Sequence, residues 1–301
     1  MDTVANLRAF LAVARYGSFS ESARQLNVVP SVAAKRVSQL EHTVGTRLFE
    51  RSTRKVVLTE AGEKFQVSAR SLIADLDDTL AGLKRSNDRL EGRILIMVPT
   101  TLNMVVLSDA LSGFLREHEH ITMELALVNR SINPAEEGFD LAISGHAASS
   151  YEGVLDVPLY PFTQVLCASP QYLERRGTPL HPHDLGDHDG LFFKPLGTAW
   201  QFDGEQGQLT VDVRARLVAN DNITLRAAAL AGNGIAMLPR YVSGEAIRAG
   251  QLVELLGAYP MPKSWFRAHV TQHRAKLARI AKLLEWLKSA LEEALPRLEG
   301  G

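Results

Sequence analysis

The sequence predicts a small helical module joined by one long helix to a larger α/β domain. Three short helical patterns and a hairpin pattern occupy residues 1–60, and a heptad-like pattern runs through residues 61–91. After residue 92, apolar strand-like runs alternate with amphipathic stretches, which is typical of an α/β domain. The length of 301 residues agrees with roughly two domains, one of them small.

Composition excludes disordered, fibrous and membrane-spanning classes. Hydrophobic residues make up 46% of the chain and charged residues 22%, which is ordinary for a globular protein. No run of ~18 apolar residues occurs, and the polar start of the chain does not resemble a signal peptide, so we expect a cytoplasmic protein with no membrane segment. The single cysteine, Cys167, lies in an apolar run and is expected to be a buried thiol.

Charge is divided unevenly along the chain, although the net charge is only −1. Residues 1–60 carry nine Lys or Arg and five Asp or Glu, a net charge of +4. The other residues carry 24 basic and 29 acidic side chains, a net charge of −5. We therefore expect only the first module to meet a polyanion.

The first two helices of this module are delimited by their end signals. Apolar residues recur at helical spacing from Val4 until Gly17 interrupts them. Ser18 is a good N-cap for a short second helix through Leu26, and Asn27 is a plausible stop.

A third helix is expected over residues 30–43. Its buried stripe consists of Ala33, Val37 and Leu40, at i, i+4 and i+7. The opposite face carries Ser31, Lys35 and Ser38, flanked by Ala34. This outward face is small, polar and basic, so it can approach another surface closely.

A hairpin with a cationic tip follows the third helix. Strand-like runs at 47–49 and 56–58 flank the segment 50–55. Three small helices and such a hairpin predict a winged helix-turn-helix, whose third helix enters the major groove of double-stranded DNA. The candidate DNA-contacting residues are Ser31, Ala34, Lys35, Ser38, Arg51, Arg54 and Lys55. Basic residues alone would indicate only a solvated face, so the prediction depends on their combination with the helix order.

A long helix is expected from the N-cap Thr59 to about Leu90. Its heptad-like seam consists of Phe65, Ala69, Leu72, Leu76, Leu83 and Leu90. A helix of about 30 residues spans ~45 Å and cannot bury this seam against the small module alone. The pattern favours dimerisation; packing against the chain's own C-terminal domain is the alternative.

The C-terminal part predicts sheets of largely parallel strands with ligands at the carboxyl ends of those strands. Strand runs occur at 94–98, 121–128, 141–143, 165–168, 191–193, 235–238 and 252–255. Helix starts are indicated at Ser169-Pro170 and at Asn220-Asp221. A closing amphipathic helix is expected from Lys276 to about Leu295, with Pro296 marking its end.

Taken together, these residues resemble the LysR-type transcriptional regulators along nearly the whole chain. The N-terminal resemblance rests on Leu7-Arg8-Ala9-Phe10, Gly17-Ser18-Phe19, Ala23, Leu26, Arg36, Leu40-Glu41, Gly45, Arg47-Leu48-Phe49-Glu50-Arg51 and Leu58-Thr59-Glu60-Ala61-Gly62. The C-terminal resemblance rests on residues 165–173 and 231–239. The sequence departs from the family pattern at Val29 and Ala34, where Ser or Thr is common, which leaves the preferred base sequence open.

The resemblance implies a sequence-specific DNA-binding regulator whose promoter contacts respond to a small-molecule effector. It implies a cytoplasmic homodimer or homotetramer, a partner RNA polymerase if the protein activates transcription, and no enzymatic activity or cofactor. The implied fold is an N-terminal winged helix-turn-helix (1–60), a linker and dimerisation helix (61–91) and a C-terminal effector-binding domain (92–301). That domain would be an α/β periplasmic-binding-protein-like (type 2) domain of two subdomains, residues 92–160 with 270–301 and residues 161–269. The crossing strands are expected near 158–163 and 266–270.

By position, the resemblance places an effector between these subdomains. The implied effector-binding residues are Thr100, Thr101, Asn103, Asn129, Arg130, Trp200 or Phe202, Asp221 and Asn222. Hydroxyls and amides at a strand-to-helix turn suit an anion, which favours an organic or aromatic acid. The alternative is that Asn103 and Asn222 are simply N-caps.

Other chemical patterns in the chain are weak. The segment 181–189 contains three His and three Asp, but its proline and its spacing favour a solvated loop over a metal site. No complete dinucleotide fingerprint, phosphate-binding loop or nucleophile elbow occurs, which argues against an enzyme. The remaining alternatives are a regulator without an effector, and a solute-binding or catalytic α/β protein whose helical module does not bind duplex DNA.

Overall fold

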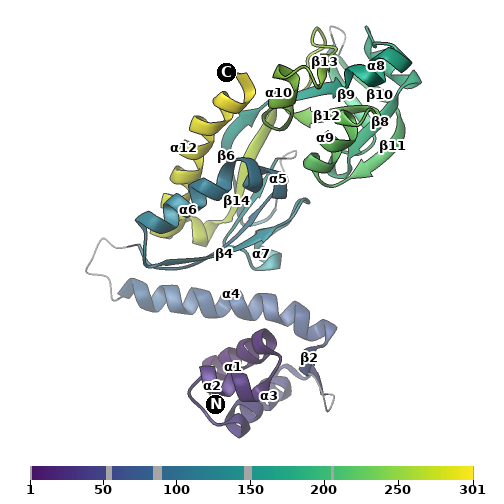
Figure 1. Cartoon of the computed structure of the whole chain (residues 1–301). Helices are drawn as coiled ribbons and strands as arrows, with labels where there is room; N and C mark the ends of the chain where they lie inside the picture. Colours follow the sequence, from purple (N-terminus) through teal and green to yellow (C-terminus); the bar gives the residue numbers. More distant parts are fainter. Residues whose placement is uncertain (1, 52–55, 84–89, 146–150, 205–206, 301) are drawn as a thin grey trace. The chain divides into compact units, whose positions relative to one another are not determined.

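The computed structural model describes residues 2–51, 56–83, 90–145, 151–204 and 207–300 (Figure 1). The chain divides into two compact units. The first, here named the head, contains residues 1–89 with 136–139, and the second, the α/β unit, contains residues 90–135 and 140–301. The short helix α7 (Pro134–Glu137) is divided between them.

Three helices with clear end signals form the head. They are α1 (Thr3–Tyr16), α2 (Phe19–Gln25) and α3 (Pro30–Val44). Asp2 and Ser18 cap α1 and α2 by accepting hydrogen bonds from the backbone N–H three residues on. Gly17 ends α1 in the left-handed region at φ 62°, which costs glycine little. The predicted positions of these three helices are confirmed.

The hairpin consists of β1 (Phe49–Arg51) and β2 (Val56–Leu58), which pair antiparallel. Its first strand begins two residues later than the sequence indicated. Before this strand begins, the carbonyls of Arg47 and Leu48 accept hydrogen bonds from the hydroxyl and the backbone N–H of Thr59, respectively. The Phe10 ring contacts the rings of Phe49 and Phe65 at centroid distances of 5.4 and 5.3 Å, so helix, hairpin and long helix share one core.

The long helix is α4 (Glu60–Leu83), and Thr59 caps it through a 2.9 Å hydrogen bond from the Gly62 N–H. Of the predicted seam, Phe65 and Ala69 pack into the head core. Leu72 and Leu80 are 57% and 49% exposed on the same helix. Leu90 does not extend the seam: it packs into the core of the α/β unit, because the chain there is about to enter a buried strand.

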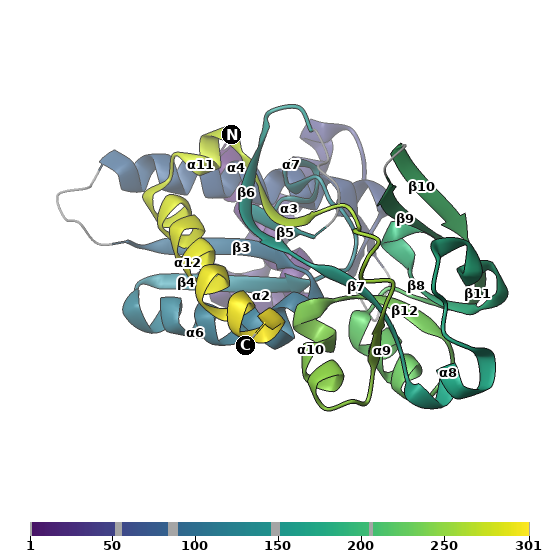
Figure 2. The same cartoon turned by 90° about the horizontal axis from the view of Figure 1, so that it is seen from above.

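The first sheet of the α/β unit has the strand order β4-β3-β5-β14-β6. Its strands are β3 (Gly92–Val98), β4 (Ile121–Leu127), β5 (Leu141–Ser144), β6 (Val154–Phe162) and β14 (Ser264–Thr271). Its helices are α5 (Thr100–Leu102), the π-helix η1 (Asn103–Leu107), α6 (Ser108–Glu117), α11 (Gln272–Ala275) and α12 (Ala278–Gly300). Helices α6 and α12 lie together along this sheet (Figure 2). Apolar side chains from β3, β5, β14, α6 and α12 form its core.

Helix α12 corrects one expectation, because it continues through Pro296 to Gly300. Proline lacks the N–H that would donate within the helix and costs about 3 kcal/mol in a helix interior. Leu295 is fully buried and Leu298 packs against the same core on the far side of the proline. We infer that this packing outweighs the local cost.

The second sheet has the order β11-β8-β12-β7-β13. Its strands are β7 (Gln164–Ala168), β8 (Asp189–Phe193), β11 (Arg214–Ala219), β12 (Ile235–Pro239) and β13 (Val253–Leu255), and a separate hairpin is formed by β9 (Ala199–Gly204) and β10 (Gly207–Asp212). Its helices are α8 (Pro170–Arg176), η2 (Pro182–Asp187), η3 (Lys194–Leu196), α9 (Asn222–Leu230) and α10 (Arg240–Arg248). Burial raises the pKa of the Cys167 thiol in β7 to about 12, which agrees with the expected buried thiol.

Both sheets are mixed rather than largely parallel. In the first, β14 runs antiparallel to β5 and β6, and in the second, β7 runs antiparallel to β12 and β13. The chain passes between the sheets at Thr163 and in the segment 256–263. Residues 161–162 and 264–269, which the sequence assigned to the second subdomain, therefore belong to the first sheet, because β6 extends to Phe162 and β14 pairs with it along its whole length.

Candidate functional site

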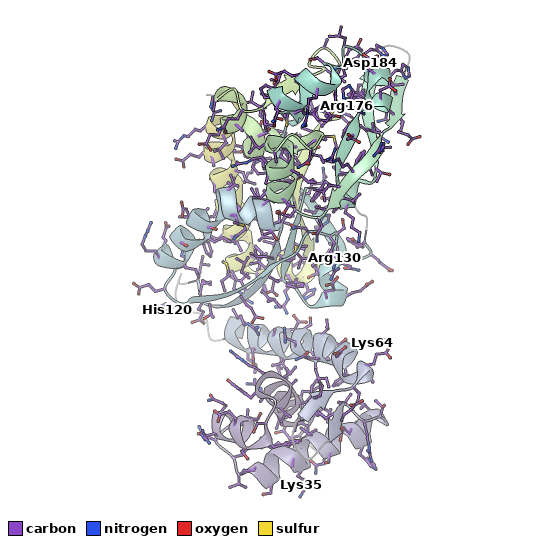
Figure 3. The ribbon with its side chains drawn as sticks, turned by 45° about the vertical axis from the view of Figure 1, so that its right-hand side comes forward. Lys35, Lys64, His120, Arg130, Arg176 and Asp184 are labelled. Atoms are coloured by element: carbon purple, nitrogen blue, oxygen red, sulfur yellow. The ribbon has the colours of Figure 1, made fainter. Side chains whose placement is uncertain are left out.

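The outward face of α3 carries four of the residues that the sequence predicts as DNA contacts. Ser31, Lys35 and Ser38 are exposed, and Ala34 between them is half-buried. Ala33, Val37 and Leu40 on the opposite face are buried in the head core. Lys35 lies on the outer side of the head (Figure 3). The helix therefore offers a face of short side chains and one long cation, which can approach a groove closely.

Glu41 holds the hairpin against α3. One of its carboxylate oxygens accepts hydrogen bonds from the backbone N–H groups of Leu48, at 2.9 Å, and of Phe49, at 3.2 Å. The hairpin and the outward face of α3 are thus held in a defined relative position within the head. The sequence pattern contained Glu41 only as part of the family resemblance and did not indicate this positioning role.

The outward face continues for one more turn to His42, which is exposed and four residues beyond Ser38. The helical spacing could have indicated His42, which lies outside the predicted set of DNA-contacting residues. Of the three candidates in the hairpin, the backbone of Arg51 lies in β1, whereas Arg54 and Lys55 lie outside the described residues.

A cleft separates the two sheets of the α/β unit. Its lining comprises Pro99, Thr101, Asn129, Gly145, Phe162, Gln164, Phe193, Leu196, Asn222, Pro239, Tyr241 and Phe266. The free volume is about 30 Å³, far below the roughly 300–1,000 Å³ of a typical small-molecule pocket. The cleft is therefore closed around its polar and aromatic walls in this conformation.

One hydrogen bond joins the two walls. The Thr101 hydroxyl, at the start of α5, donates to Asp221 Oδ1 at 3.1 Å, and Asp221 is the N-cap of α9. Partial burial would raise the pKa of this carboxyl, but hydrogen bonds from Thr224 and Thr101 outweigh it and hold the pKa below its ordinary value. The carboxylate is thus charged at neutral pH, and its stabilising effect is present above the unfolded pKa of about 3.9 and lost as pH falls through the lower folded pKa.

Replacing Thr101 by valine should raise the population of the open cleft about 10-fold or more, because a hydrogen bond to a charged acceptor contributes about 1.5–3 kcal/mol. Hydrogen–deuterium exchange should then be faster in residues 97–103 on one wall and 219–225 on the other. Thr224→Val is the matched control, since it removes a 2.9 Å hydrogen bond to the same carboxylate but within α9. Unchanged exchange at 97–103 in Thr101→Val would mean that this bond does not hold the cleft closed.

Three of the predicted effector residues line the cleft, namely Thr101, Asn129 and Asn222. Thr100 lies beside it, where its backbone N–H donates to Asn129 Oδ1 at 2.8 Å. Asn103 lies outside the lining: it begins the π-helix η1, and its amide nitrogen donates to Ser108 Oγ at 3.2 Å. The N-cap of α9 is Asp221, so Asn222 is the first helical residue rather than a cap.

Trp200 or Phe202 was expected in the cleft, and this expectation is wrong for both residues. Both side chains are 1% exposed and pack in the core of the second sheet, where the Trp200 and Phe192 rings lie 4.9 Å apart. Alternate residues of a strand face the same side, so both rings of β9 point inward together. The cleft receives Phe193 from the end of β8 instead. Arg130 is exposed and is not part of the lining (Figure 3).

Aromatic rings at the chain crossings form one wall of the cleft. Phe162 and Phe266 are stacked at 4.3 Å, and Tyr241 meets their rings edge-on at 6.0 and 5.8 Å. Gln164, two residues beyond Phe162, also lines the cleft, and its buried Oε1 has no hydrogen-bond partner among the described residues. The cleft thus combines an aromatic surface with an unsatisfied amide.

The last turn of α12 contacts the crossing itself. Glu299 accepts hydrogen bonds from the Thr163 backbone N–H, at 3.0 Å, and from its hydroxyl, at 3.3 Å. Half-burial raises the pKa of the Glu299 carboxyl above its ordinary value. A helix of the first subdomain therefore holds the point at which the chain enters the second.

The segment 181–189 has a structural explanation. Its residues form the turn η2, in which the His181 side chain accepts a hydrogen bond from the His183 N–H and Asp184 accepts from the His181 N–H. Within the described residues, no group of three His, Cys, Asp or Glu side chains could hold a metal ion. No helix in the same ranges is long and apolar enough to cross a membrane.

Two family models, both of the LysR family, match this chain. The model for the bacterial regulatory helix-turn-helix protein, lysR family, matches residues 4–63, which cover the head helices and the hairpin. The model for the LysR substrate binding domain matches residues 87–292, which contain both sheets and the cleft.

Individual relatives and solved structures agree with this match. The chain is 32% identical to an uncharacterised HTH-type transcriptional regulator of Haemophilus influenzae, over 87% of this chain and 92% of that protein. It is 30% identical to the uncharacterised HTH-type regulator YhjC of Escherichia coli, over 98% and 100%. Among structures, the LysR-type regulator CrgA of Neisseria meningitidis matches with a TM-score of 0.60 and 26% identity, covering 95% of this chain and 98% of CrgA. ArgP of Mycobacterium tuberculosis, with a TM-score of 0.68 and 19% identity over 96% and 97%, shares the fold. With a matching family model across most of its length and these relatives, the chain belongs to the LysR family of DNA-binding transcriptional regulators.

Proposed function

We propose that this regulator contacts promoter DNA through the outward face of α3 and the hairpin, and that a small molecule in the cleft alters these contacts. The observation that carries the proposal is the α3 face, on which short polar side chains surround Lys35 while the opposite face is buried. The proposed contacts are Ser31, Ala34, Lys35 and Ser38 on the helix, with Arg51, Arg54 and Lys55 in the hairpin. The corresponding organisation is DNA binding in residues 1–60, linking in 61–91 and effector sensing in 92–301.

For the effector, we propose an organic acid with an aromatic group. The rings of Phe162, Phe266 and Phe193 offer an apolar surface for it, and Thr101, Asn129 and Asn222 offer hydrogen bonds. The lining supports the aromatic group of the proposed ligand more strongly than its acidic group. The described lining contains no Lys or Arg to pair with a carboxylate, and the N-terminus of α9 is already capped by Asp221. Entry of such a ligand would require the cleft to widen from its free volume of about 30 Å³, and the Thr101–Asp221 hydrogen bond between its walls would oppose this opening.

We further propose that the protein acts as a homodimer or homotetramer. The exposed Leu72 and Leu80 on α4 support this, because a second copy of the helix would remove both from water. Where the protein activates transcription, RNA polymerase would be a further partner. We place the protein in the cytoplasm and assign it no catalytic activity.

Fluorescence anisotropy tests the proposal directly. The full chain is titrated against the intergenic duplex beside its own gene at two salt concentrations, with random duplex as the control. The proposal expects specific, salt-dependent binding that one member of a panel of aromatic acids alters. Each acid is paired with its neutral amide, so that a response to the amide alone would refute the acidic part. Weak, salt-insensitive binding without preference would refute DNA recognition by the head.

A further inference from the structure

Valine is an unfavourable residue for the position that Val29 occupies in the head. It is the N-cap of α3, with extended backbone at φ −81° and ψ 151°, and it makes no side-chain capping hydrogen bond. Its side chain is 59% exposed. The preceding helices α1 and α2 have the oxygen-bearing caps Asp2 and Ser18. A valine here neither caps the helix nor fills the core, so the stability of the head does not explain it.

The surroundings of Val29 indicate a role in contact with another molecule. It directly precedes Pro30, which is exposed at the first helical position, and Ser31 begins the proposed DNA face. In helix-turn-helix proteins the N-terminal residues of the third helix are those that contact base edges. Ala34, one turn further along, is small and leaves the approach open.

The chemistry of the side chain selects what it can recognise. Valine can neither donate nor accept a hydrogen bond, so it cannot recognise the donors and acceptors of base edges or phosphates. The apolar group that a base pair presents in the major groove is the C5-methyl of thymine. An exposed branched side chain at the tip of α3 is complementary to that methyl group.

We propose that Val29 is a specificity-determining residue that contacts a thymine C5-methyl group in each half of the DNA site. This inference rests on the proposed docking of α3 in the major groove. Removing one methylene-sized group from such a contact should weaken binding about 4-fold in one half-site, and about 15-fold when both half-sites are changed.

Uracil tests the proposal, because it differs from thymine only by lacking the methyl group. Duplexes that bind the full chain are first selected from a random library. Each thymine of the selected site is then replaced by deoxyuridine in turn, and dissociation constants are measured by anisotropy. We expect one thymine per half-site at which the replacement produces the 4-fold loss.

The variant Val29→Ser connects that position to the side chain. Serine supplies the missing cap, so the thermal midpoint should not fall, and any loss of DNA affinity cannot be attributed to unfolding. Because the variant loses the contact in both half-sites, it should bind the thymine duplex about 15-fold more weakly, as the unchanged protein binds a duplex with deoxyuridine at this position in both half-sites, and it should no longer distinguish the two duplexes. Val44→Ser changes another exposed valine of α3, at the opposite end, and should keep the full preference for thymine.

The outcomes separate this inference from the proposed function. Specific binding with no sensitivity to deoxyuridine at any position would overturn the role of Val29 and leave DNA recognition by α3 standing. A thymine preference that survives in Val29→Ser would assign the methyl contact to another residue and would also overturn it. Absence of salt-dependent duplex binding would overturn both the role of Val29 and the proposed recognition of DNA by α3.

Discussion

Replacing Lys35 and Arg54 together by alanine is expected to weaken specific DNA binding about 10- to 100-fold at physiological salt. Lys35 is exposed on the outward face of α3, and Arg54 belongs to the cationic segment of the hairpin. Each cation that neutralises a phosphate releases condensed counterions. The negative slope of log K, where K is the association constant, against log salt concentration should therefore become shallower by about one for each residue removed. Anisotropy titrations on the selected duplex at several salt concentrations measure both quantities.

A charge-matched control separates this local effect from the change in net charge. Lys282 and Lys288 are exposed on α12 in the α/β unit, and their double alanine variant removes the same charge. We expect this control to keep most of its affinity and its salt slope. Thermal stability should be nearly unchanged in both variants, because Lys35, Lys282 and Lys288 are exposed and Arg54 is not expected in the core from sequence. If the Lys35 and Arg54 variant binds DNA as the unchanged protein does, the docking face is wrong.

Replacing Arg274 by leucine is expected to destabilise the α/β unit by about 3–5 kcal/mol. The Arg274 side chain is 5% exposed and contacts Asp140, which is 9% exposed, with 3.1 Å between Nε and Oδ1. Asp140 Oδ2 also accepts a hydrogen bond from the Leu95 N–H at 2.8 Å, so the aspartate connects α11 to β3. Without the guanidinium, a buried carboxylate loses a cation 3.1 Å away, and this accounts for the size of the effect.

Tryptophan fluorescence in urea measures this loss in the relevant unit. The three tryptophans, Trp200, Trp265 and Trp286, all belong to the α/β unit, so the signal does not report on the head. We expect the urea midpoint to fall by about 1–2 M. Lys282→Ala breaks an exposed pair with Glu285 and should shift the midpoint little. Equal small shifts in both variants would contradict a structural role for the buried pair.

Local signals in the sequence were sufficient for the head. Ser18 and Gly17 mark helix ends by chemistry that acts within three or four residues, and the buried stripe of α3 follows from its spacing. The same reasoning indicated seven strands of the α/β unit (β3, β4, β5, β7, β8, β12 and β13) and the buried Cys167, because an apolar run needs no distant partner to be recognised. It did not indicate β9, β10 or β11, and β6 and β14 were expected only as the crossing strands that the family resemblance implies. The outward face of α3 could be predicted because it is the side of the helix opposite the buried stripe.

The cleft was decided by the tertiary structure. Its cross-wall bond joins Thr101 to Asp221, 120 residues apart, and Glu299 reaches Thr163 across 136 residues. Sequence position assigned Phe202 to the cleft and overlooked Phe193, because the direction of a ring depends on how its strand is placed in the sheet. Pro296 likewise indicated a helix end that packing of Leu295 and Leu298 overrides. Sequence alone therefore determined the three helices of the head, the apolar central strands of the α/β unit and the exposed face of α3, since these depend on neighbouring residues. The closed cleft and its lining depend on contacts between distant segments, which form only when both sheets have packed.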